Sequence, residues 1–177
     1  MTVGVYNIGL IGAGQIGSRH LQGLAKSTLQ YKIYVVDPDE KSLSVAKIRY
    51  QEVSPKNTSN TVTFSAELDQ LPDVLDVLII ATPSHIRRNV IEKLVKKFIV
   101  QYIILEKIVF QKSDDFLPIF NLFAKKNIRS WINCWRRSFS LYKDLKKELY
   151  GHTLVIKASG TKWGLGCNAI HLIDLLV

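Results

Sequence analysis

The sequence is poor in cysteine, with only Cys134 and Cys167 among 177 residues. The two are not spaced as C-x-x-C, so we expect neither a zinc site nor a disulfide framework. Apolar runs of transmembrane length are also lacking, as is a basic-then-apolar leader with a small-residue cleavage site. These absences predict no metal, no membrane association and a cytoplasmic location.

The remaining composition is that of a globular protein, with 47% hydrophobic residues. A length of 177 residues suits one domain, or one domain and part of another. The net charge is +9, which could indicate nucleic acid binding. The basic residues are spread along the chain, however, apart from short pairs such as Arg87-Arg88, Lys96-Lys97, Lys125-Lys126 and Lys146-Lys147. We interpret the pairs as solvated helix faces, compatible with a weak attraction for anionic ligands such as nucleotides, and expect no nucleic acid partner.

Short apolar segments alternate with segments of helical period, which predicts an α/β fold with a parallel sheet. The segment 74–81 is nearly continuously apolar, as in a strand buried on both faces. We expect strands near 5–11, 31–37, 61–64, 74–81, 101–106 and 129–134. We expect helices near 15–27, 39–50, 85–98, 113–126 and 139–149.

The alternation stops after about residue 130, where a single strand over 152–159 and an apolar helical segment over 170–177 are predicted. Domains seldom end on such a segment unless it docks onto something. Three explanations remain open: the segment packs on the preceding domain, it packs on another chain, or the chain is a truncated piece of a longer protein.

Three glycines, Gly12, Gly14 and Gly17, form a G-x-G-x-x-G motif between an apolar strand and a helix. In this motif the first glycine allows a tight turn, the second lets a pyrophosphate approach the backbone, and the third lets helix and strand pack closely. The helix start also offers unpaired N–H groups and a partial positive charge to the phosphates. The motif therefore predicts a dinucleotide site in a doubly wound Rossmann domain over residues 1–130.

Asp37 ends the second predicted strand, 20 residues after Gly17. A carboxylate at this place can accept both ribose hydroxyls of an adenosine and repels a 2′-phosphate. It predicts NAD as the cofactor, with NADP disfavoured. The alternative is a plain glycine turn with Asp37 as a helix cap.

Two further strand ends carry polar residues at the carboxyl edge, where open α/β sheets bind their ligands. Thr82 and Pro83 follow the strand near 74–81, and Glu106 and Lys107 follow the next one. Lys107 could donate a hydrogen bond to a substrate hydroxyl and help lower its pKa, or it could be a solvated lysine.

The histidines allow similar alternatives. His171 and Asp174 are three apart on a predicted helix and share a face, where a histidine beside a carboxylate can shuttle protons. They could equally be a helix-start histidine and a solvent-facing aspartate. His85 lies at a helix start, and His20 lies on the first helix, beside the phosphate loop.

The order of these motifs resembles the glucose–fructose oxidoreductase and inositol dehydrogenase family (Gfo/Idh/MocA), whose members are NAD(P)-dependent oxidoreductases acting mostly on sugars and sugar derivatives. Five segments carry the resemblance: Gly12-Ala13-Gly14-Gln15-Ile16-Gly17 with His20, Ala81-Thr82-Pro83, Leu105-Glu106-Lys107, Asn133-Cys134-Trp135-Arg136-Arg137 leading into Tyr142 and Leu145-Lys146, and His171-Leu172-Ile173-Asp174-Leu175.

The resemblance implies roles for individual residues. Lys107 would contact the reacting hydroxyl, His171 would act as acid/base or orient the substrate, and Asn168 would hydrogen-bond the substrate. The implied cofactor contacts are Gly12, Gly14, Gln15, Ile16, Gly17, Asp37, Thr82, Pro83, His85 and Glu106.

Three features depart from the family pattern. Ile108 replaces the proline that follows the lysine, where a cis bond or rigid turn would aim the side chain. Cys167, followed by Asn168, stands in place of a carboxylate four residues before the histidine, and Asn168 cannot serve as a base. A branch associated with surface-sugar biosynthesis has a similar Cys-Asn pair. Family members are also longer, so residues 131–177 would begin a truncated α+β substrate domain.

Two functions follow. The first is an NAD-dependent oxidoreductase, or its N-terminal part, that transfers a hydride between the nicotinamide and a carbon of a sugar or sugar nucleotide, with surface-sugar biosynthesis as one setting. The second is a non-catalytic NAD-binding fragment. The apolar C-terminal segment also suggests a homo-oligomer as one possibility.

Overall fold

The computed structural model describes residues 4–53, 59–155, 157, 159–162 and 164–175. The chain forms two compact units, Met1–Ile132 and Asn133–Val177. Each unit is described by itself below.

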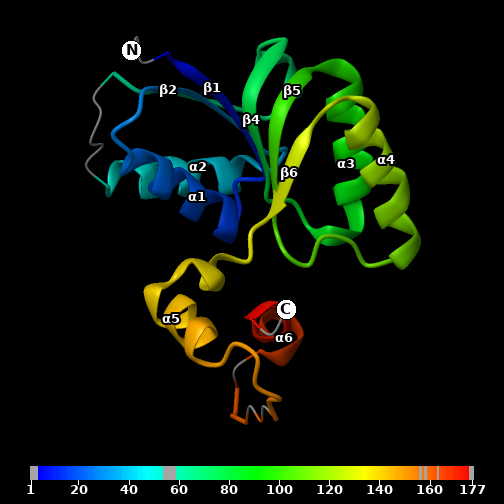
Figure 1. The fold of residues 1–177 in the computed structure, drawn as a ribbon. Coiled ribbons are helices and arrows are strands. Elements are labelled where there is room, and N and C mark those ends of the chain that lie inside the picture. Colours follow the sequence, from blue (N-terminus) through cyan, green and yellow to red (C-terminus); the bar gives the residue numbers. More distant parts are fainter. Residues whose placement is uncertain (1–3, 54–58, 156, 158, 163, 176–177) are drawn as a thin grey trace. The chain divides into compact units, whose positions relative to one another are not determined.

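The first unit is built on a six-stranded sheet in the order β3-β2-β1-β4-β5-β6, with every neighbouring pair parallel (Figure 1). The order reverses between β1 and β4, which is the topology of a Rossmann fold. All six strands expected before residue 135 are present in this sheet, so the predicted Rossmann fold class is confirmed. The strands are β1 (Tyr6–Ile11), β2 (Tyr31–Val36), β3 (Thr61–Ser65), β4 (Val74–Ile80), β5 (Ile99–Leu105) and β6 (Arg129–Ile132).

Helices cover both faces of this sheet, α1 and α2 on one side and α3 and α4 on the other (Figure 1). Each layer has its own apolar core, one including Leu21 of α1 and Ala46 of α2, the other including Leu94 of α3 and Phe123 of α4. The helices are α1 (Gln15–Ala25), α2 (Glu40–Gln51), α3 (Ser84–Lys97) and α4 (Phe116–Lys125), with the short 3₁₀ turns η1 (Leu68–Gln70) and η2 (Ser113–Asp115).

The central strands are buried as their apolar sequences require. Leu10 of β1, Ile80 of β4 and Ile103 of β5 are fully buried, because a parallel sheet covered on both faces exposes neither side of its inner strands. The ends of β1 and β4 are also joined beyond the ladder, since the backbone N–H of Ala81 donates to the carbonyl of Ile11 at 2.8 Å. The central strand ends therefore form one continuous edge.

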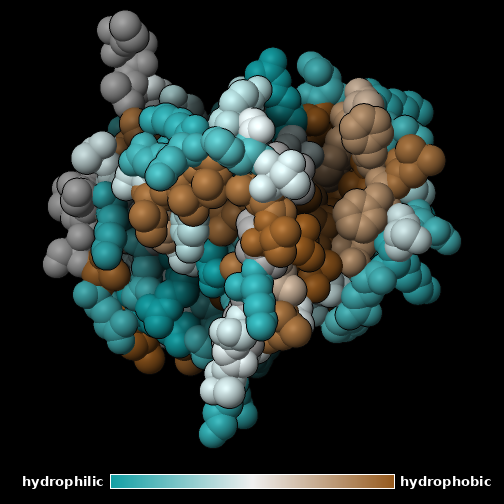
Figure 2. All heavy atoms as spheres, turned by 60° about the horizontal axis from the view of Figure 1, so that its bottom comes forward, coloured by the Kyte–Doolittle hydropathy of each residue, from teal (hydrophilic) through white to brown (hydrophobic). Residues whose placement is uncertain are grey.

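Apolar residues remain exposed on the outer side of the first unit. Phe116, Leu117 and Phe120 of α4 are all exposed, Phe120 by 68%. Figure 2 shows hydrophobic residues on the right of its view, the side on which α4 lies in Figure 1. Ile119 and Phe123 of the same helix are buried, so α4 carries apolar residues on both its inner and its outer side.

The second unit contains η3 (Trp135–Ser138), α5 (Ser140–Glu148) and α6 (Leu165–Leu175). The predicted apolar helix is present as part of α6, while residues 176–177 lie outside the described residues. The strand predicted over 152–159 is wrong for the residues described there, 152–155, 157 and 159, which are not in a strand. A strand needs a neighbour for its hydrogen bonds, and an isolated apolar alternation does not supply one.

No helix among the described residues has the length and apolar character needed to cross a membrane. Nor do they bring together three His, Cys, Asp or Glu side chains that could hold a metal ion.

Candidate functional site

The glycine loop lies between β1 and α1, and its three glycines face different surroundings. Gly12 has a φ of 93°, and a Cβ there would lie 2.9 Å from the carbonyl carbon of Ala81. A Cβ on Gly17 would overlap the carbonyl oxygen of Gly12, whereas a Cβ on Gly14 would meet no atom within 4 Å. Packing therefore requires Gly12 and Gly17, while Gly14 faces open space.

The start of α1 is left open by its own sequence. Gly14 is the N-cap residue and offers no side-chain cap, so the first N–H groups of the helix have no capping acceptor from that residue. The positive end of the helix dipole adds to this region. An uncapped helix start beside the unobstructed Cβ position of Gly14 offers N–H donors and a partial positive charge, which suit an anionic group.

Hydrogen bonds from Arg49 of α2 support the helix that follows the glycine loop. Arg49 donates to Ser18 Oγ at 2.6 Å and to Gln15 Oε1 at 2.8 Å. Ser18, which is fully buried, donates in turn to the carbonyl of Gly14 at 2.9 Å. The sequence did not single out Arg49, because the residues that it contacts lie more than thirty positions earlier in the chain.

Asp37 follows β2 and faces the glycine loop. Its Oδ2 accepts from the backbone N–H of Ala13 at 2.6 Å, and its Oδ1 accepts from the N–H of Asp39 at 2.9 Å. The cap of α2 is Asp39, which accepts from the N–H groups of Lys41 and Ser42. The alternative of Asp37 as a helix cap is therefore wrong. Each carboxylate oxygen of Asp37 keeps further acceptor capacity for a ribose hydroxyl.

The ends of β4 and β5 meet at the same edge. The N–H of Glu106 donates to the carbonyl of Ile80 at 3.2 Å. Thr82 is buried, and its Oγ1 has no hydrogen-bond partner within the described part of the chain. Pro83 precedes α3 and His85 lies in its first turn, and both are exposed.

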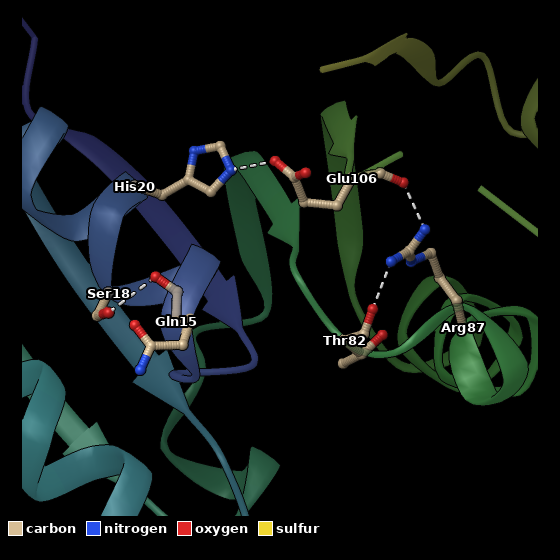
Figure 3. A network of polar contacts seen from close by, with 6 residues as sticks. All are labelled: Gln15, Ser18, His20, Thr82, Arg87 and Glu106. Carbon is tan, nitrogen blue, oxygen red and sulfur yellow. Dashed lines mark hydrogen bonds and ion pairs between the residues drawn. The ribbon is translucent and has the colours of Figure 1, made fainter. Parts of the chain in front are cut away.

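His20 and Glu106 form a contact between α1 and the end of β5. The Nε2 of His20 lies 2.7 Å from Oε1 of Glu106, and the Glu106 side chain is only 6% exposed (Figure 3). The sequence placed His20 beside the phosphate loop and Glu106 near the nicotinamide but did not join them. This pair ties the helix that starts at the glycine loop to the segment carrying Lys107.

Arg87 of α3 is a correction to the predicted solvated helix face. It is 3% exposed, and its guanidinium donates to the carbonyls of Thr82, Glu106, Ile108 and Val109. Figure 3 shows the bonds to Thr82 and Glu106. Burial lowers the pKa of Arg87, and the nearby charge of Glu106 opposes that effect. The sequence does contain a signal for this burial. Arg87 lies four residues before Ile91 and seven before Leu94, so helical periodicity places it on the buried face of α3.

The neighbouring Arg88 behaves as the sequence predicts for a helix surface. It is half-buried and pairs with Asp115 at 2.7 Å and with Glu92 at 3.0 Å. These hydrogen bonds, that of Asp115 first, raise the pKa of Arg88.

The residues predicted for catalysis fall in different units. Lys107 belongs to the first unit, is half-buried, and is joined to Ile108 by a cis peptide bond. Asn168 and His171 belong to the second unit, on α6. Nε of Arg137, in the same unit, donates to Oδ2 of Asp174 at 2.8 Å.

His171 is buried on α6, and its ring lies against Trp135 with centroids 6.0 Å apart. Asn168 lies one turn earlier and donates to the carbonyl of Gly164 at 3.4 Å. The predicted solvent-facing alternative for Asp174 does not hold, because Arg137 binds its carboxylate. The indole of Trp135 therefore gives one side of the His171 imidazole an apolar neighbour.

The chain is similar to a known protein family. Residues 6–133 match the model of an oxidoreductase family with an NAD-binding Rossmann fold (GFO_IDH_MocA). The match covers the glycine loop, Asp37, and the ends of β4 and β5. The comparison with curated proteins gives no match.

Solved structures share the fold. WlbA dehydrogenase from Chromobacterium violaceum, in complex with NADH and UDP-GlcNAcA, is 20% identical with a TM-score of 0.64, and the match covers 84% of this chain and 41% of that one. UDP-N-acetylglucosamine 3-dehydrogenase GnnA from Acidithiobacillus ferrooxidans is 18% identical with a TM-score of 0.63, over 83% of this chain and 42% of that one. A dehydrogenase from Chromobacterium violaceum is 18% identical with a TM-score of 0.67, over 98% and 54%.

The chain thus spans between 41% and 54% of the length of these three proteins. At such identities the likeness establishes the fold.

Proposed function

Because this chain belongs to the Gfo/Idh/MocA family of oxidoreductases, we propose that it binds NAD as part of an enzyme that oxidises or reduces a carbon of a sugar or sugar nucleotide. The observation that carries the proposal is the open Gly14 position at the uncapped start of α1, facing Asp37 across the glycine loop. A pyrophosphate and a ribose need these two features at this spacing.

The residues present fit this cofactor. Gly12, Gly14 and Gly17, with the helix-start residues Gln15 and Ile16, would hold the pyrophosphate, and Asp37 would hold the adenosine ribose. The negative charge of Asp37 favours NAD over NADP, since it repels a 2′-phosphate.

At the other half of the cofactor we assign contacts to Thr82, Pro83, His85 and Glu106. The Oγ1 of Thr82 supports this assignment because it is buried and has no hydrogen-bond partner among the described residues. A buried hydroxyl in that state costs free energy unless a ligand bonds to it. NAD, when bound, supplies the hydride acceptor or donor.

Residues of this chain would transfer the proton of the substrate hydroxyl. We propose that Lys107 donates a hydrogen bond to the substrate hydroxyl and favours its loss of a proton, and that His171 takes up or returns that proton. Asn168 would orient the substrate by hydrogen bonding. The substrate class rests on the similar proteins, one in complex with UDP-GlcNAcA and one a UDP-N-acetylglucosamine 3-dehydrogenase.

The domain assignment is part of the same proposal. Residues 1–130 would form the NAD-binding domain, and residues 131–177 would begin the substrate domain. We also propose that the apolar face of α6 mediates association with a second copy.

Calorimetric titration of the chain with NADH and with NADPH tests the proposal. We expect binding of NADH and weaker binding of NADPH. Failure to bind either cofactor would refute the proposal. Binding of NADH without oxidation or reduction of any UDP-sugar would favour the alternative of a non-catalytic NAD-binding fragment.

A further inference from the structure

Arg87 is a buried cation whose bonds all go to backbone. Its two terminal nitrogens donate to four carbonyls, including Ile108 at 2.6 Å and Val109 at 3.0 Å. Its Nε has no partner in the part of the chain that the structure describes. Burying a guanidinium costs free energy unless every donor is satisfied, and here Nε is not. Stability alone is therefore a weak reason for an arginine at this position.

The four carbonyls come from two separate strand ends. Thr82 follows β4, whereas Glu106, Ile108 and Val109 follow β5. One planar fork therefore fastens the segment carrying Thr82 to the segment carrying Lys107. An arginine can do this because its donors are fixed in one plane, whereas a lysine has a single flexible ammonium group.

The position of this fork relative to the cofactor follows from the topology. A dinucleotide lies across the switch point between β1 and β4. Asp37, at the end of β2, would take the adenosine half, so the nicotinamide half must lie on the side of β4 and β5. The Arg87 fork is attached only to that second side.

We propose that Arg87 is a positioning residue for the nicotinamide half of the site, holding the ends of β4 and β5 in the register at which Thr82 and Glu106 meet the cofactor and Lys107 meets the substrate. This inference rests on the proposed binding of NAD. Arg87 touches neither cofactor nor substrate in this role and acts only through the backbone that it holds.

Two ligands separate this role from a merely structural one. NADH contains both halves of the cofactor, while ADP-ribose contains the adenosine half, the pyrophosphate and a ribose but no nicotinamide. We would measure the affinity of both by calorimetry for the wild-type chain and for Arg87→Lys and Arg87→Met. Thermal unfolding of each variant would be followed by circular dichroism.

We expect Arg87→Lys to lose about tenfold in NADH affinity, since it removes charge-assisted bonds that order the nicotinamide side. The affinity for ADP-ribose should stay within about twofold, because the hydrogen bonds of Arg87 in the described chain go to the ends of β4 and β5 and not to the glycine loop or Asp37. Arg87→Met should show the same split, larger in size.

Arg88→Met is the matched control. It lies next to Arg87 on α3 but bonds to Glu92 and Asp115 and to neither strand end. It should leave both affinities unchanged. The NADH emission spectrum gives an independent readout, because a displaced nicotinamide changes its environment in the Arg87 variants and not in the control.

Equal losses for NADH and ADP-ribose would overturn the inference, as would an unchanged NADH affinity. If neither Arg87 variant folds, the arginine serves the fold and the positioning role is wrong. If the wild-type chain binds neither ligand, the proposed function itself fails, which is a different result from any of these.

Discussion

Gly14 and Gly17 belong to one motif, yet we expect Gly14→Ala to lose NADH affinity and Gly17→Ala to lose stability. At Gly14 the backbone is extended, with a φ of −62°, and an added Cβ meets no atom within 4 Å. Alanine is sterically permitted there. It loses a little as an N-cap and gains from a stiffer unfolded chain, so we expect the free energy of unfolding to change by less than about 1 kcal/mol.

The same methyl group would occupy the space through which a pyrophosphate reaches the helix start. Losing one or two charge-assisted hydrogen bonds there should lower NADH affinity roughly 10- to 100-fold. At Gly17 the added Cβ overlaps the carbonyl oxygen of Gly12, which is backbone and cannot turn away. We expect Gly17→Ala to cost about 1–3 kcal/mol or more of unfolding free energy.

Urea unfolding and NADH calorimetry on both variants give the comparison. Gly23→Ala is a control on the same helix, at an exposed position where a Cβ meets nothing. It should stabilise the chain by about 0.5–1 kcal/mol and leave NADH binding alone. If Gly14→Ala bound NADH as tightly as the wild type, the open side of the loop could not be the pyrophosphate site. If Gly17→Ala were as stable as the wild type, the packing argument would be wrong.

Three further outcomes are expected. Asp37→Asn keeps an acceptor for the N–H of Ala13 but loses the charge that repels a 2′-phosphate, so the preference for NADH over NADPH should fall by about tenfold or more; equal preference in variant and wild type by calorimetry would contradict the assignment. His20→Phe removes the 2.7 Å contact to the buried Glu106 and should cost about 1–3 kcal/mol in urea unfolding, and an unchanged unfolding midpoint would show that the pair is unimportant. The pKa of Asp39 is lowered from 3.8, first by the hydrogen bond from the Ser42 side chain and then by the N–H of Lys41. Since the folded pKa lies below the unfolded one, the stability from this cap is fully present above the unfolded pKa and is lost as the pH falls through the folded pKa. The stability difference between the wild type and Asp39→Ala should therefore shrink below about pH 4, and a difference that stays constant between pH 6 and pH 2.5 in circular dichroism melts would count against it.

The sequence predicts the first unit well because its signals are local. The four inner strands β2, β1, β4 and β5 are short, mostly apolar runs, and the glycine motif marks the turn from β1 into α1 within six residues. The spacing between Gly17 and Asp37 is likewise fixed by one βαβ unit. Periodicity and spacing are enough wherever the deciding contacts lie within one such unit.

The errors arise where the deciding contact is distant. The segment 152–159 has an apolar character, but a strand depends on a neighbour that the local pattern does not contain. Asp37 looks like a helix cap by its place before α2, yet the cap falls to Asp39 because Asp37 bonds to Ala13 across the loop. His20 and Glu106 are 86 residues apart, so no spacing rule could join them.

Arg87 shows how a local pattern can be visible and still be misinterpreted. As one of a basic pair it suggests a solvated surface, but its helical phase places it with Ile91 and Leu94 on the buried face of α3. An apolar side chain in that place would fill the same volume and avoid the cost of burying a charge. It would leave the carbonyls of Thr82 and Glu106 without the donor that joins them. Packing alone therefore does not account for an arginine at this position. A role in fixing the two strand ends accounts for both the charge and the direction of its bonds, since a guanidinium presents several donors in one rigid plane and can reach carbonyls of two segments at once.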